Sequence, residues 1–232
     1  MEAIISEYIT CVIEAVMTMA FCLLVARNSL RKRLPLLALI VAVLAVLGSA
    51  ASIALWEYLA VWLPFSMDFS LASLPFWFAA GFVLLRWATG EPPSGLLLVL
   101  LLSMQTLSLC RIVTHFIYVL FFPALTEGTL CWADIEGFGI PSVVLTLLMA
   151  EFCRRLYQKL QGLNPKEYVH LWFIPLFFIL LTELQVNFFP VDEGYSLGYG
   201  LKILIHLCAF ITYSQTAWAV SSSAKAAKEA ET

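Results

Sequence analysis

Seven stretches of mostly apolar residues follow one another along this chain of 232 residues. Each approaches the length of about 20 residues that an α-helix needs to cross a hydrocarbon core of about 30 Å. A soluble domain could not bury so much apolar surface, because 62% of the residues are hydrophobic and only 12% are charged, against about 25% charged in ordinary globular proteins. We therefore predict an all-α, polytopic bundle of seven transmembrane helices in contact with the lipid bilayer. The spans are expected at residues 3–26, 34–56, 69–86, 94–122, 137–157, 168–189 and 196–220.

The positions of the basic residues predict how this bundle is oriented. Eleven of the 13 Lys and Arg residues lie in four places at the span ends or between spans, and the alternate loops contain none. Because Lys and Arg favour the cytoplasmic side, the N-terminus is expected outside the cell and the C-terminus in the cytoplasm of a multi-pass cell-membrane protein. The eleven residues are Arg27, Arg31, Lys32, Arg33, Arg86, Arg154, Arg155, Lys159, Lys166, Lys225 and Lys228.

Two further features define the expected domain organisation. The N-terminus lacks a basic region before its first apolar stretch, so no cleavable signal peptide is expected. Residues 221–232 are rich in Ala, Lys and Glu, which are strong helix formers. We therefore expect a membrane domain at 1–220 and a cytoplasmic helical tail at 221–232.

Ionisable residues within the spans are the candidate functional residues. Each costs about 2.5–3.5 kcal/mol at the bilayer centre on insertion scales, so each needs a partner or a wet cavity. By position, five are expected in the outer half of the membrane, and Glu14 and His206 nearer its middle. The seven candidate ligand-binding residues are Glu7, Glu14, Arg111, His115, Glu183, Lys202 and His206.

Helical spacing places most of these residues in three polar stripes, which must face other helices or water. The sequence therefore predicts an outward-facing polar chamber or a buried network of ion pairs. In one interpretation the charges only fix the register and orientation of the helices. In the other they bind a ligand, with Arg111 and Lys202 holding an anionic group and the carboxylates an amine. The stripes are Glu7, Thr10, Glu14 and Thr18; Gln105, Ser108, Arg111 and His115; and Tyr199, Lys202, His206 and Tyr213.

Glu151 and Arg155 form a separate pair, four residues apart at the cytoplasmic end of the fifth span. This spacing predicts a salt bridge on the helix surface.

Three segments carry a resemblance to a known family. They are the opening sequence from Tyr8 through Glu14, the basic first loop from Arg27 to Arg33, and the Ala/Lys/Glu-rich exit from the last span. Together they resemble the membrane sensor half of bacterial sensor histidine kinases of the accessory-gene-regulator type, which carry a GHKL-type ATP-binding domain. The resemblance extends over the whole chain.

The resemblance implies a function in signal transduction by a two-component system. An extracellular ligand, such as a modified peptide, would bind the bundle, and the last helix would pass the signal to a cytoplasmic kinase domain or partner, with a homodimer among the arrangements implied. Two departures stand against it: this sequence contains no phosphoacceptor histidine region or ATP-binding motif, and such relatives often have six spans.

Other classes of protein compete with the sensor. A small-solute transporter, or a subunit of one, would use the same polar groups but should continue them to the cytoplasmic side. A light-sensing protein would need a Schiff-base lysine near the middle of the last span, and Lys202 is too close to the outer end. No HExxH or GxSxG motif occurs and the three histidines are scattered, so no catalytic residue, metal or cofactor is predicted. Nothing in the charge distribution indicates nucleic-acid binding.

Overall fold

The computed structural model describes residues 2–60, 69–121, 140–161, 163, 165–188 and 195–230, and within these ranges the regular structure is entirely helical. Seven long helices and one short 3-10 helix are formed there, and no strand. They are α1 (Glu2–Val25), η1 (Arg27–Ser29), α2 (Leu34–Ala60), α3 (Phe69–Thr89), α4 (Pro93–Phe121), α7 (Ile140–Leu160), α8 (Pro165–Phe188) and α9 (Tyr195–Ala230). The all-helical prediction is therefore confirmed for the described ranges.

Each expected span coincides with one long helix, within a few residues at most ends. Pro93 and Pro165 each occupy the first position of their helix, where the missing N–H of proline is harmless. α7 is displaced from the expected 137–157 toward the C-terminus. α9 continues without interruption through the tail to Ala230, as the composition of the tail predicts.

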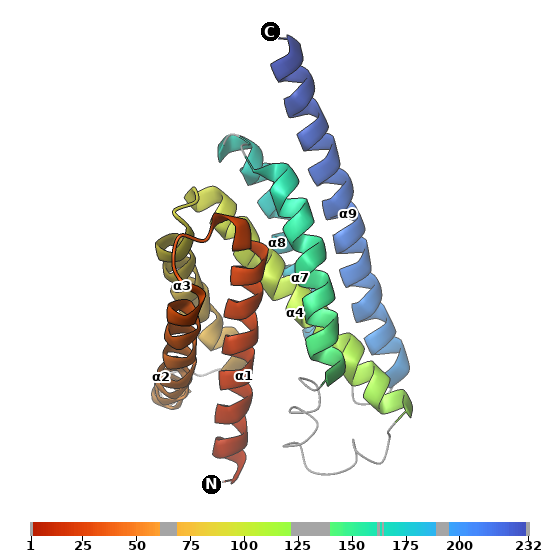
Figure 1. Ribbon diagram of the computed structural model, residues 1–232. Coiled ribbons are helices and arrows are strands. Elements are labelled where there is room, and N and C mark those ends of the chain that lie inside the picture. Colours follow the sequence, from red (N-terminus) through yellow and green to blue (C-terminus); the bar gives the residue numbers. More distant parts are fainter. Residues whose placement is uncertain are drawn as a thin grey trace.

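The long helices alternate in direction, and Figure 1 shows the N-terminus and the C-terminus at opposite ends of the bundle. α4 is central because it packs against α1, α3, α7, α8 and α9. α2 lies at the edge and packs mainly on α1 and α3 (Figure 1). Large apolar side chains of α2, such as Leu39 and Leu47, are accordingly exposed, as a lipid-facing helix requires.

Small residues allow the helices to approach one another closely. In a bilayer, helix association depends on packing rather than on the exclusion of water, so small side chains are favoured at the contacts. Several alanines are almost completely buried at such contacts, and Ser and Thr hydroxyls inside the helices donate to carbonyls of the preceding turn, for example Thr106 to Leu102 at 2.6 Å. Among the buried alanines are Ala45, Ala88, Ala150, Ala209 and Ala217.

Within the described residues, three helices are long and apolar enough to cross a membrane, through the segments Leu34–Leu55, Pro93–Thr114 and Gly200–Ser223. Shorter apolar segments lie in α1, α3 and α8 at Cys11–Val25, Phe76–Thr89 and Leu171–Thr182. The structure therefore agrees with a membrane-associated helical bundle.

The loops that join α1 to α2, α3 to α4 and α7 to α8 meet at one end of the bundle (Figure 1). Hydrogen bonds connect them: Ser29 donates to Glu91, and Gln161 donates to Ser29 over 2.9 Å. In addition, the Arg31 amide donates to the carbonyl of Ala88 over 2.9 Å. We call this end, which carries Arg27–Arg33, Arg86 and Lys159, the basic end. The loops expected on the other side, at 57–68, 123–136 and 190–195, lie mostly outside the described residues.

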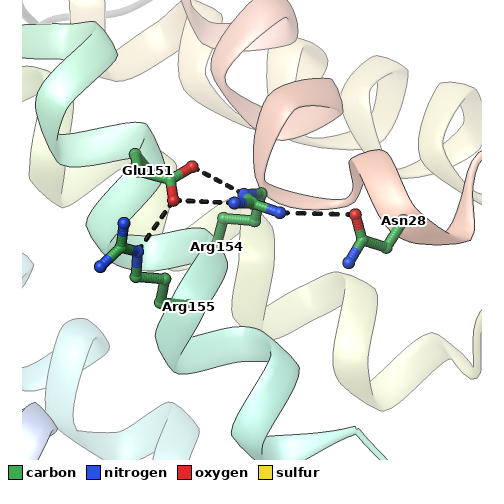
Figure 2. A network of polar contacts seen from close by, with 4 residues as sticks. All are labelled: Asn28, Glu151, Arg154 and Arg155. Carbon is green, nitrogen blue, oxygen red and sulfur yellow. Dashed lines mark hydrogen bonds and ion pairs between the residues drawn. The ribbon is translucent and has the colours of Figure 1, made fainter.

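An ion-pair network on α7 also lies at the basic end. Glu151 accepts from Arg155 over 2.8 Å, which confirms the predicted pair. Figure 2 shows that Arg154 binds the same carboxylate through two hydrogen bonds of 2.7 Å and reaches Asn28 over 3.5 Å. Arg154 of α7 is thus held beside Asn28 of the first loop.

Candidate functional site

A cavity of about 250 Å³ lies among α1, α3, α4, α8 and α9. α1 and α4 supply most of its polar surface. Glu14 and Thr18 lie one helical turn apart on α1, and Gln105, Ser108 and Arg111 follow at intervals of three residues on α4. These residues are parts of two of the three polar stripes in the sequence, so the fold brings those stripes together across one cavity.

An ion pair between α4 and α1 stands at the mouth of the cavity. Arg111 donates from its guanidinium group to Oε1 of Glu14. The two side chains are 44% and 37% exposed, whereas Gln105 and His206 in the same cavity are 4% and 1% exposed. The cavity is therefore accessible at the ion pair and closed deeper in the bundle.

The inner part of the cavity contains two polar groups with complementary hydrogen-bonding capacity. The Gln105 Nε2 atom is buried and has no hydrogen-bond partner among the described residues. His206 Nδ1 lies 2.8 Å from the carbonyl oxygen of Lys202. Because a carbonyl can only accept, Nδ1 carries the proton, and in the neutral ring Nε2 is left as an acceptor. The inner part of the cavity therefore offers one donor and one acceptor.

The remaining lining is apolar and rich in aromatic and thioether side chains. Gly81 of α3 faces Leu100 of α4 so closely that a Cβ atom on the glycine would lie 2.9 Å from Leu100 Cδ2. Methionine adapts its shape to irregular contacts, as a surface that receives a ligand requires. The aromatic and methionine residues of the lining are Met17, Met19, Trp77, Phe78 and Met104.

Packed apolar side chains fill the bundle between the cavity and the basic end. Cys22 lies in the lining and its thiol donates to Ser103 over 3.1 Å. Phe21 lies next to Cys22, and Val25 and Leu96 lie closer to the basic end. All three are at most 1% exposed and belong to one core cluster. Among the described residues, no Asp, Glu, Lys, Arg or His side chain is buried on this side of the cavity, where the buried polar groups are hydroxyls such as those of Ser94 and Thr89.

The structure brings three of the seven predicted ligand-binding residues, Glu14, Arg111 and His206, into one cavity. Lys202 contributes its carbonyl group to His206 but is not part of the lining. Glu7, His115 and Glu183 lie on α1, α4 and α8, and their side chains lie outside the described residues.

Other residues of the cavity were not predicted as ligand-binding. Gln105 belonged to a polar stripe, and its position beside Arg111 was the available signal. Trp77, Phe78 and Gly81 gave no signal, because almost every residue around them in the sequence is apolar too. Among the described residues, no three His, Cys, Asp or Glu side chains are grouped so that they could hold a metal ion.

The fold and the cavity define a helical, membrane-associated protein with a polar cavity that is open at an ion pair. No protein-family model, curated protein or solved structure matches the chain. The similarity to sensor histidine kinases therefore rests on the residues alone and stays a prediction.

Proposed function

We propose that this chain is the membrane module of a sensor, which binds an extracellular ligand in the cavity and signals through α9. In this proposal the chain crosses the cell membrane seven times, with the N-terminus outside and the basic end in the cytoplasm. The observation that carries the proposal is the cavity itself, which is accessible at an ion pair and closed beyond its inner end by the packed apolar core. A receptor needs a site that opens to one side only.

The charge distribution supports the orientation. The basic residues of the first loop and of the helix ends beside two further loops gather at one end, and Lys and Arg favour the cytoplasmic side of a membrane. The ion pair lies on the other side of the apolar core, and so in the outer part of the bundle. A ligand would reach Glu14 and Arg111 from outside the cell.

The path from the cavity to the cytoplasm is one continuous helix. His206 lines the cavity and belongs to α9, which continues to Ala230. The 15 residues from His206 to Ser221 span about 22 Å at 1.5 Å per residue. If α9 can pack in two ways against the bundle, a ligand with different affinity for the two states shifts the equilibrium between them. The tail would then be shifted or rotated. In the sensor the tail would act on a cytoplasmic kinase domain or partner, and a homodimer would bring two tails together.

A small-solute transporter would use the same cavity as one half of an alternating-access pathway. The apolar cluster around Phe21 and Leu96 supports the sensor instead, because no charged side chain of the described residues is buried in that half of the bundle.

One experiment measures both the conformation of the tail, by fluorescence, and the uptake of added compounds. The full chain, with Cys131 and Cys208 replaced by Ser, carries an environment-sensitive fluorophore at Ser223→Cys and is reconstituted in liposomes. The 20 L-amino acids and a peptide digest are added outside. A sensor changes tail fluorescence without accumulating the compound, and Gly81→Leu, which obstructs the cavity, abolishes the change.

Two results would contradict the proposal. One is accumulation of the added compound inside the liposomes, which would identify a transporter. The other is a tail signal that no compound changes.

A further inference from the structure

We propose that the ligand is a small zwitterion of about the size of tyrosine, with an amine and a carboxylate at one end, an apolar body, and a hydroxyl group at the other end. This inference rests on the proposed function and specifies the ligand of the same cavity. Three parts of the cavity carry it: the ion pair at the mouth, the apolar walls, and the polar groups inside.

The ion pair at the mouth fits a head group that bears both charges. Arg111 and Glu14 form an ion pair with each other in the absence of a ligand. A ligand with only a carboxylate would bind Arg111 and break its ion pair with Glu14. A simple amine would bind Glu14 and break the ion pair with Arg111. A zwitterion replaces the one ion pair with two, so both charges stay compensated. Arg is well suited to this exchange because its guanidinium group binds carboxylates through two hydrogen bonds.

The inner polar groups fit a hydroxyl group. The Nε2 atom of Gln105 needs an acceptor and has none among the described residues. Nε2 of His206 is an acceptor, since Nδ1 donates to the Lys202 carbonyl. A hydroxyl group accepts one hydrogen bond and donates another, so it can serve both residues at once. A methyl group or a bare aromatic edge in this position would leave the buried amide unpaired.

The walls and the size of the cavity fit a single aromatic ring between these two ends. A cavity of about 150 Å³ is large enough for benzene, so about 250 Å³ accommodates one ring with a short polar head. Gln105 and Arg111 are six residues apart on α4, which places them about 9 Å apart along the helix axis. That separation suits a molecule with a charged group at one end and a hydroxyl group at the other. Trp77 and Phe78 supply aromatic surfaces for the ring.

The test is calorimetric titration of the full chain in lipid nanodiscs with four probes. L-tyrosine carries all three features. Tyramine lacks the carboxylate, 3-(4-hydroxyphenyl)propionate lacks the amine, and L-phenylalanine lacks the hydroxyl group. We expect L-tyrosine to bind about tenfold or more tightly than each of the others, because each analogue lacks one of the charged or polar interactions that L-tyrosine makes in the cavity.

Variants connect each preference to a residue. Gln105→Leu should remove the preference for L-tyrosine over L-phenylalanine, and the matched control Gln215→Leu, at an exposed position of α9 outside the cavity, should keep it. Glu14→Gln should remove the preference for L-tyrosine over the propionate. The comparison of Gln105→Leu with Gln215→Leu does not disturb the ion pair, so it stays informative if the Glu14 variant fails to fold.

The inference is overturned if L-tyrosine does not bind, if it binds no better than the three analogues, or if Gln105→Leu and Gln215→Leu behave alike. Such a result leaves the proposed function standing if the peptide digest or another amino acid still changes tail fluorescence. If nothing changes the tail signal, the proposed function fails as well.

Discussion

Arg111 of α4 is paired with Glu14 of α1, 97 residues earlier in the sequence, and the pair stands where the cavity opens. Both groups are more than a third exposed, so the pair joins two helices without being sealed inside the bundle. An ion pair in this position keeps the two charges compensated while they remain accessible to a ligand.

The first prediction concerns the coupling between these two residues. Arg111→Gln and Glu14→Gln should each lower the free energy of unfolding by about 1 kcal/mol, the upper end for exposed pairs. The double variant should lose less free energy of unfolding than the two single variants lose together. In the double variant both charges are absent, so no charge of the pair remains without the other. Thermal unfolding in nanodiscs measures the stability of the two single variants and of the double variant. Arg33→Gln, in the exposed first loop, is the control and should change stability by less than about 0.5 kcal/mol. Strictly additive effects would contradict the pairing.

The second prediction concerns Gly90, which ends α3 with a φ of 73°. This left-handed conformation costs a residue with a Cβ atom about 1 kcal/mol. A Cβ atom here would also lie 2.5 Å from Cζ of Arg31. Gly90→Ala should therefore destabilise the protein by about 1 kcal/mol or more. Combining Gly90→Ala with Arg31→Ala should restore the part of the stability that is lost through the clash with Arg31. A neutral Gly90→Ala variant would show that this loop has a different conformation.

The third prediction concerns the buried tyrosines near the basic end. The hydroxyl group of Tyr213 has no hydrogen-bond partner among the described residues, whereas that of Tyr168 donates to the Leu160 carbonyl over 2.7 Å. A buried unpaired hydroxyl group is unfavourable, so Tyr213→Phe should raise the free energy of unfolding by about 1 kcal/mol, and Tyr168→Phe should lower it by a similar amount. Thermal unfolding of the two variants gives opposite shifts. A loss of stability in Tyr213→Phe would mean that its hydroxyl group is paired, for instance with a buried water molecule.

The fourth prediction concerns Glu151, which binds both Arg154 and Arg155 (Figure 2). Glu151→Gln should lower thermal stability slightly, because two neighbouring cations then repel each other without the carboxylate. The difference from the unmodified protein should shrink in 1 M salt, where the screening length is about 3 Å. An effect of equal size at low and high salt would indicate a loss of packing instead of a loss of charge pairing.

The helices were largely predictable from the sequence, because the length of an apolar stretch is a local property. Pro93 and Pro165 also define helix starts by their own chemistry, independent of the rest of the fold. The ends of α7 were less well predicted. Glu151, Arg154 and Arg155 interrupt its apolar sequence, so hydropathy alone does not define where the helix lies relative to the membrane.

The candidate site was predictable only in part. Helical spacing identified the polar faces of α1 and α4, and these faces do meet. The partner of Arg111 was not predictable, because Glu7, Glu14 and Glu183 were all possible and the choice depends on how each helix is rotated. The apolar half of the cavity was invisible for a related reason: in a membrane protein, residues such as Phe78 that face a cavity and residues that face lipid are equally apolar.

The most direct test of the central claim measures from which side of the membrane the cavity is reached. Single cysteines replace Ser29, Ser108 or Lys159 in the chain without Cys131 and Cys208, and a small membrane-impermeant thiol reagent is added to intact cells or to inside-out vesicles. We predict that the cysteine at 108 reacts from outside, and that those at 29 and 159 react from the cytoplasmic side alone. Reaction of position 108 from the cytoplasmic side, or of positions 29 and 159 from opposite sides, would contradict the proposed orientation and the extracellular cavity.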